Sequence, residues 1–155
     1  MNAILNRVCR LSLLVMLSGC SGLKPYPSTV DANLQIRTKL AGSLLTGVGA
    51  SLHIYRMMGG CATRYLGSVK LKNGLNQVGI APGQPTFLVF SFNTSARLGG
   101  GTSTIDSTTV FTPRAGGRYT AYVHYADRIY NVSMQEMGPD DTPGREIERG
   151  ERDCP

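Results

Sequence analysis

Short segments in which apolar and polar residues alternate recur along most of the chain, whereas the i, i+3, i+4 spacing of amphipathic helices is scarce. A period of two places every second side chain on the same face, which is typical of a half-buried β-strand. Turn sequences rich in Gly, Pro and Asn bound the strands predicted in this way, which cover residues 33–40, 51–57, 65–72, 76–80, 86–92, 103–112, 119–125 and 128–134. Seven or eight such strands predict an all-β protein, either a single antiparallel β-sandwich or a small barrel.

The last two predicted strands form a hairpin whose register can be tested. Pairing 119–125 with 128–134 around a turn at Ala126-Asp127 places Val123 opposite Tyr130 and leaves one face apolar. Tyr119, Tyr125 and Tyr130 then point to the core. The other, polar face carries Tyr122 and His124.

The N-terminus has the layout of a secretory signal. Arg7 and Arg10 precede a seven-residue apolar run, 11–17, which is followed by the small residues Ser18 and Gly19 and then Cys20. The run is far shorter than the ~20 apolar residues that a permanent transmembrane helix needs. An ordinary secreted protein with a cysteine at this boundary is the alternative.

The tetrapeptide Leu17-Ser18-Gly19-Cys20 resembles the lipobox of bacterial lipoproteins. This resemblance implies cleavage after Gly19 and lipidation of Cys20, and Ser21, in place of the Asp that retains such proteins in the inner membrane, implies the outer membrane. The expected organisation is a signal peptide over 1–19, a lipidated Cys and tether over 20–30, a β-sandwich domain over 31–137 and an irregular acidic tail over 138–155. Several acyl chains would anchor the protein firmly in the outer membrane, facing the periplasm.

Two cysteines remain once Cys9 is discarded with the signal peptide and Cys20 is lipidated. The envelope outside the inner membrane is oxidising, so Cys61 and Cys154 are predicted to form a disulfide that fastens the tail to the body. A free thiol or an intermolecular bridge is the alternative. Neither cysteine has a second Cys or a His at ligand spacing, so no metal site is expected.

A second resemblance concerns the domain itself. Ile54-Tyr55-Arg56, the strand Leu66-Gly67-Ser68-Val69 and the turn Ala81-Pro82-Gly83-Gln84 before an apolar strand look like PEGA-type and related small lipoprotein β-domains. These are transthyretin-like or immunoglobulin-like sandwiches. The resemblance covers residues 52–92 and implies a fold without specifying a function.

Charge is distributed unevenly along the chain. The formal net charge is +6 over 155 residues, but residues 20–137 carry 11 basic and 4 acidic side chains, whereas residues 138–155 carry six acids and three arginines. This indicates a basic body with an acidic tail, suited to anionic lipid or envelope polymer; dispersed, solvated charge is the alternative. The basic residues are not interleaved with aromatics, so nucleic acid is not an expected partner.

Catalytic motifs are not apparent in the sequence. The histidines His53 and His124 each stand alone, no Ser lies in a nucleophile elbow, and few carboxylates could pair for glycoside cleavage. We therefore expect that the protein is not an enzyme and binds no cofactor. Tyr122 and His124 are the candidate binding surface. The expected function is a binding or assembly module, such as an accessory subunit of an envelope or secretion complex; the alternative is a small inhibitor or ligand-binding lipoprotein acting on a cell-wall hydrolase or an envelope polymer.

Overall fold

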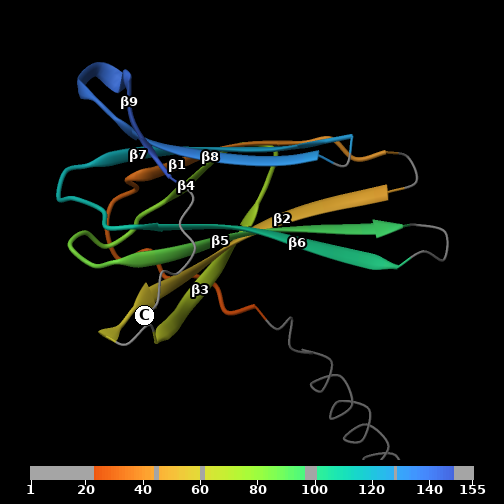
Figure 1. Ribbon diagram of the computed structural model, residues 1–155, viewed down its shortest axis with the longest axis horizontal. Helices are drawn as coiled ribbons and strands as arrows, with labels where there is room; N and C mark the ends of the chain where they lie inside the picture. The colour runs from red at the N-terminus through yellow and green to blue at the C-terminus, as the bar shows by residue number, and fades with distance from the viewer. Residues whose placement is uncertain (1–22, 44–45, 60–61, 97–100, 128, 149–155) are drawn as a thin grey trace, which may run out of the picture.

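The protein folds as a β-sandwich of two sheets, as predicted (Figure 1). The computed structural model describes residues 23–43, 46–59, 62–96, 101–127 and 129–148. The four-stranded sheet has the order β3-β2-β5-β6, and its strands are β2 (Thr46–Met57), β3 (Thr63–Leu71), β5 (Thr86–Ala96) and β6 (Thr102–Phe111). All of its pairings are antiparallel.

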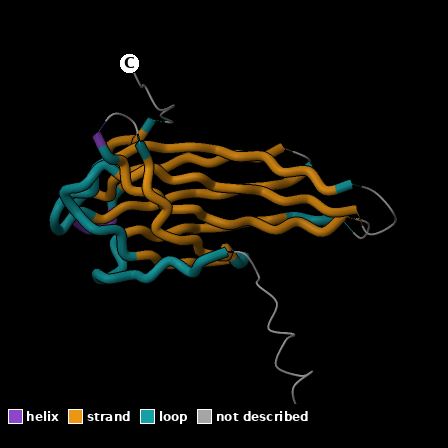
Figure 2. Tube along the Cα trace, turned by 90° about the horizontal axis from the view of Figure 1, so that it is seen from below, coloured by secondary structure: helices purple, strands orange, loops and turns teal. Residues whose placement is uncertain are grey.

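The five-stranded sheet has the order β4-β1-β7-β8-β9. Its strands are β1 (Leu34–Leu40), β4 (Gly74–Val78), β7 (Arg118–Ala126), β8 (Ile129–Met137) and β9 (Pro143–Ile147). This sheet is mixed rather than purely antiparallel, because β1 and β7 pair in parallel. Figure 2 shows the strands of both layers running along the long axis of the molecule.

The core lies between the sheets and is built from alternate residues of the central strands. Leu52 and Ile54 of β2, and Leu88, Phe90 and Phe92 of β5, are at most 1 % exposed. Across the sandwich, the ring of Phe92 stacks on Tyr125 at a centroid distance of 6.2 Å and contacts Tyr130 at 5.7 Å. This alternation is the physical basis on which the strands were predicted.

The β7–β8 hairpin differs from the predicted register by two residues. Val123 lies opposite Val132 and not Tyr130, because the turn is centred on Asp127 and residue 128. Asp127 has a φ of 51°, which suits the first central position of the two-residue turns that close hairpins. A shift of two residues keeps every side chain on its predicted face, so Tyr119 and Tyr125 are buried, and Tyr130 packs on Phe92 while 36 % exposed.

The composition after Gly138 predicts an irregular tail, but this segment contains regular structure. A 3-10 turn (Pro139–Asp141) leads into β9, which adds a fifth strand beside β8. Proline is tolerated at the first residue of an edge strand, where its missing N–H costs no ladder hydrogen bond. Residues 149–155 lie outside the described part of the chain.

The predicted tether is also partly wrong. Residues 24–30, which we call the strap, lie against the sandwich: the backbone N–H of Tyr26 donates to the Ser68 carbonyl at 2.9 Å, and that of Ser68 donates to the Lys24 carbonyl at 2.8 Å. Tyr26 packs against the core. The strap therefore belongs to the domain and extends the four-stranded sheet beyond β3.

Candidate functional site

The predicted surface residues Tyr122 and His124 lie on the outer face of the five-stranded sheet. Along β7, their neighbours Ala121 and Val123 are at most 1 % exposed and point into the core, whereas Tyr122 is 41 % exposed and His124 is exposed. Alternation along a strand accounts for this arrangement. Whether the two residues bind a ligand remains a prediction.

Pairing with β1 brings two cations beside them. The parallel register places Arg37 next to Tyr122 and Lys39 next to His124. On the other side of β1, the antiparallel register of β4 places Leu75 next to Arg37. Since neighbouring strands lie about 4.8 Å apart, these side chains form one surface. We call Arg37, Lys39, Leu75, Tyr122 and His124 the cationic face.

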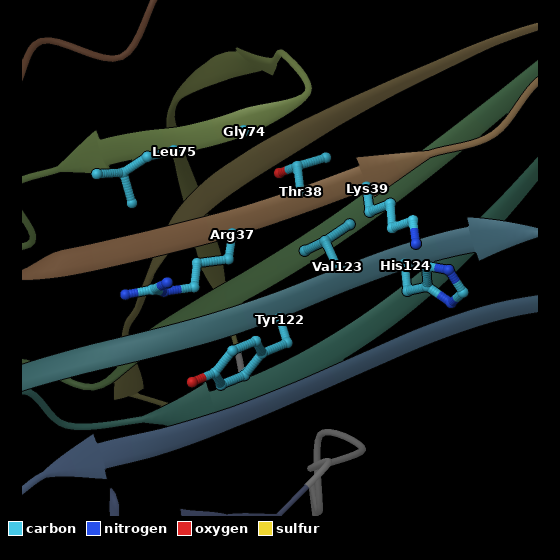
Figure 3. Close-up of a pocket in the computed structure, with 8 residues that line it drawn as sticks. All are labelled: Arg37, Thr38, Lys39, Gly74, Leu75, Tyr122, Val123 and His124. Atoms are coloured by element: carbon cyan, nitrogen blue, oxygen red, sulfur yellow. The ribbon is translucent and has the colours of Figure 1, made fainter. Parts of the chain in front are cut away.

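The cationic face surrounds a shallow hollow of about 450 Å³ (Figure 3). Figure 3 shows Arg37 and Tyr122 projecting from adjacent strands, with the ammonium group of Lys39 directed toward His124. Leu75 is 58 % exposed and supplies the apolar part of the wall. None of the residues lining this hollow is acidic.

A second hollow of about 350 Å³ continues from the first, and Arg37 and Tyr122 line both. At its far end a guanidinium nitrogen of Arg118 lies 2.8 Å from a carboxylate oxygen of Asp141, which comes from the turn before β9. That carboxylate is therefore already paired. The cations of the first hollow have no such partner among the described residues.

The chemistry of this face suits binding of an anion that carries an apolar or planar group. A guanidinium can hold a carboxylate or phosphate through two parallel hydrogen bonds, and Tyr122 and Leu75 offer contact area beside it. An adjacent carboxylate that could orient His124 as a base is not present in the hollow. Among the described residues, no group of three or more His, Cys, Asp or Glu side chains could hold a metal ion.

The other predicted site residues are not brought to this face. Cys20, Cys61 and Cys154 lie outside the described residues. His53 lies on the four-stranded sheet, where its Nε2 is 3.1 Å from the Ser51 hydroxyl. In the part of the chain that the structure describes, no helix has the length and hydrophobicity to cross a membrane.

Sequence reasoning missed Arg37, Lys39 and Leu75 as members of the site. The alternation over 33–40 places both cations on the polar side of a strand, but it contains no signal that β7 is the neighbouring strand. Comparison of the chain with protein-family models, with curated proteins and with solved structures finds no match. The function is accordingly inferred from the chemistry of the cationic face and from the N-terminal sequence.

Proposed function

We propose that the protein is a lipid-anchored binding module of the bacterial envelope and that its cationic face binds an acidic segment of a protein partner. The observation that carries the proposal is the grouping of Arg37, Lys39 and His124 around exposed Tyr122, with no acid lining the hollow. Exposed tyrosine beside arginine is the composition of binding hot spots. A partner that supplies carboxylates would neutralise Arg37 and Lys39.

The anchor and its location belong to the same proposal. The lipobox-like sequence ending at Cys20 supports lipid attachment, and Ser21 supports the outer membrane, facing the periplasm. In that oxidising compartment, Cys61 and Cys154 form a disulfide. The partner then belongs to an envelope or secretion complex of which this chain is an accessory, non-enzymatic subunit.

The binding role is tested by photo-crosslinking in cells that express the full chain. A photoreactive phenylalanine analogue at Tyr122 should capture an envelope protein, and the same analogue at Thr104, exposed on the opposite sheet, should not. The double variant Arg37→Gln/Lys39→Gln should lose the captured species. The matched control Arg114→Gln/Arg145→Gln removes the same charge from two exposed arginines elsewhere and should retain it.

Two outcomes decide against the proposal. Equal capture at Tyr122 and Thr104, or capture that survives the loss of both Arg37 and Lys39, would show that the cationic face is not the binding surface. Capture of a cell-wall hydrolase whose activity falls on binding would instead identify the chain as an inhibitor.

For the anchor, Cys20→Ala should abolish metabolic labelling with a fatty acid. For the disulfide, the thiol count of the mature protein should rise by two on reduction.

A further inference from the structure

The strap is fastened to the sandwich at two places. At the first it runs beside β3, where the two backbone hydrogen bonds between Ser68 and the strap are reinforced by a 3.4 Å bond from the Ser68 hydroxyl to the Lys24 carbonyl. At the second it crosses the end of β4: the phenol of Tyr26 donates to the Gly79 carbonyl at 3.0 Å, and the Gly79 N–H donates to the Ser28 hydroxyl at 2.9 Å. The strap is thus held at both sheet edges.

Both crossings occur at glycines, and a side chain would not fit at either. A Cβ on Gly67 would lie 2.5 Å from the Cα of Tyr26, and Gly67 has a φ of 153°, which L side chains rarely adopt. A Cβ on Gly79 would lie 2.6 Å from the Ser28 hydroxyl and closer still to the carbonyl oxygen of Val30. Close backbone approach of this kind indicates a built contact.

A docked strap shortens the distance between the anchor and the domain. If the whole segment 20–30 were free, it could span about 35 Å, whereas the four residue steps from Cys20 to Lys24 span about 14 Å at most. The strap lies on the β3 edge of the four-stranded sheet (Figure 1), so a lipid at Cys20 would confine that edge near the headgroups. The cationic face lies on the outer side of the other sheet and is turned away.

Exposed lysines lie at the β3 edge. Lys24 begins the strap, Lys70 lies on β3, and both side chains are exposed. Lysines near a membrane surface are attracted to anionic lipids. Farther along the same outer side, the half-buried rings of Tyr65 and Tyr55 lie 5.1 Å apart, and Tyr55 lies 5.8 Å from the buried ring of Phe87.

Among the described strands of this outer side, the one acidic residue lies at the far edge. Asp106 is on β6, which is separated from β3 by β2 and β5. Contact with an anionic surface is consequently favoured at the β3 edge over the β6 edge. This charge asymmetry and the short span from Cys20 both select the same edge.

We propose that the β3 edge, with Lys24 and Lys70, rests on the anionic surface of the membrane, so that the strap holds the cationic face toward the aqueous compartment. This inference depends on the lipid anchor of the proposed function. The occupant of the β3 edge is a lipid surface. A protein partner at the same edge is an outcome that the experiment separates.

Tryptophan fluorescence provides the test, because the chain contains no tryptophan. The full chain, purified from bacterial membranes with its native modification, is reconstituted into vesicles of phosphatidylcholine with one third phosphatidylglycerol. Some of the lipids carry acyl chains brominated near the headgroup. The matched single-tryptophan variants are Tyr65→Trp at the β3 edge and Tyr122→Trp on the cationic face. Quenching by bromine should be severalfold stronger at position 65 than at position 122.

Charge and salt identify the source of the contact. Lys24→Gln/Lys70→Gln should reduce quenching at position 65, as should raising the salt concentration, whereas Arg37→Gln/Lys39→Gln should leave it unchanged. Equal quenching at the two positions, or quenching insensitive to both lysines, would overturn the inference. So would photo-capture of a protein from position 65 without quenching.

Failure of the anchor itself gives a different result. A chain without lipid at Cys20 would not float with vesicles of pure phosphatidylcholine, and the Cys20→Ala variant would behave like the parent chain. Flotation that depends on Cys20, combined with equal quenching at positions 65 and 122, keeps the proposed anchor and rejects the orientation. The two proposals therefore fail separately.

Discussion

Replacing Gly79 by alanine tests how firmly the strap is built into the fold. The new methyl group would overlap the carbonyl oxygen of Val30, and because that oxygen belongs to the backbone, the strap must move as a whole. The φ of Gly79 is not in the left-handed region, so the expected effect is steric and not one of backbone strain at position 79.

The hydrogen bonds at stake set the magnitude. Displacement at Gly79 breaks the bonds from Tyr26 and to Ser28, and complete release also breaks the two backbone bonds that join the strap to Ser68. At about 1 kcal/mol for each bond, the free energy of unfolding should fall by about 2 kcal/mol for local displacement and by about 4 kcal/mol for release. Loss of the Tyr26 contacts with the core adds to the larger value.

Urea denaturation of the mature protein measures this change, and hydrogen exchange locates it. The backbone amides of Tyr26 and Ser68 should be protected in the parent and should exchange rapidly in Gly79→Ala, while the amides of β7 stay protected. Gly49→Ala is the matched control: nothing lies within 4 Å of the Cβ that it adds, so its stability should stay within about 1 kcal/mol of the parent. If Gly79→Ala is no less stable than Gly49→Ala and keeps slow exchange at Tyr26, the close crossing does not hold the strap.

Three further substitutions test other parts of the structure. Burial raises the pKa of Tyr26, and the nearby positive charge of Arg56 partly offsets this rise. The stabilisation by the neutral phenol of Tyr26 is therefore present below pH 10 and lost as the pH rises above it. Tyr26→Phe should be about 1 kcal/mol less stable at neutral pH and should lose less stability at alkaline pH, as measured by urea titrations. Tyr65→Phe should be as stable as the parent or about 1 kcal/mol more stable, because its buried hydroxyl has no hydrogen-bond partner among the described residues; a loss above 1 kcal/mol in the same assay would show that this hydroxyl is satisfied. Phe90→Ala should cost about 3–5 kcal/mol in thermal or urea unfolding, since this ring is 1 % exposed, and a cost below 1 kcal/mol would mean that the core can collapse around the cavity.

Periodicity was sufficient to predict the strands but not all of their neighbours. The alternation in β7 correctly separates Tyr122 from the buried Val123, and it survives a two-residue error in the hairpin register because side chains repeat every two residues. The parallel contact of β1 with β7 joins segments more than eighty residues apart, and no local pattern encodes it. For this reason the sequence predicts Tyr122 and His124 as a binding surface but does not predict that Arg37 belongs to it.

Segments that contain proline are predicted incorrectly for a different reason. The strap and β9 lack clear alternation, and proline usually indicates a turn or linker. Each lies at a sheet edge, where a strand pairs on one side and a missing N–H is tolerated. Gly67 and Gly79 are the residues that allow the strap to dock, because a Cβ at either position would overlap the strap backbone. The sequence alone does not show which segment lies against these two glycines.

The uneven charge of the sequence acquires a structural explanation from the end of the sandwich at β8 and β9. There Glu136 lies 3.2 Å from Arg114 and 3.9 Å from Arg145, and Asp141 pairs with Arg118. Between Asp31 and Asp106 the chain contains no acid at all, and this stretch includes Arg37 and Lys39 of β1 and Lys70 of β3, which belong to the two proposed contact surfaces. Arg114, Arg118 and Arg145 are therefore paired within the described chain, whereas Arg37 and Lys39 of β1 and the lysines of the β3 edge remain available to an external anion. Raising the salt concentration should accordingly weaken both proposed contacts and leave the fold intact, because exposed pairs such as Arg118 with Asp141 contribute little to stability.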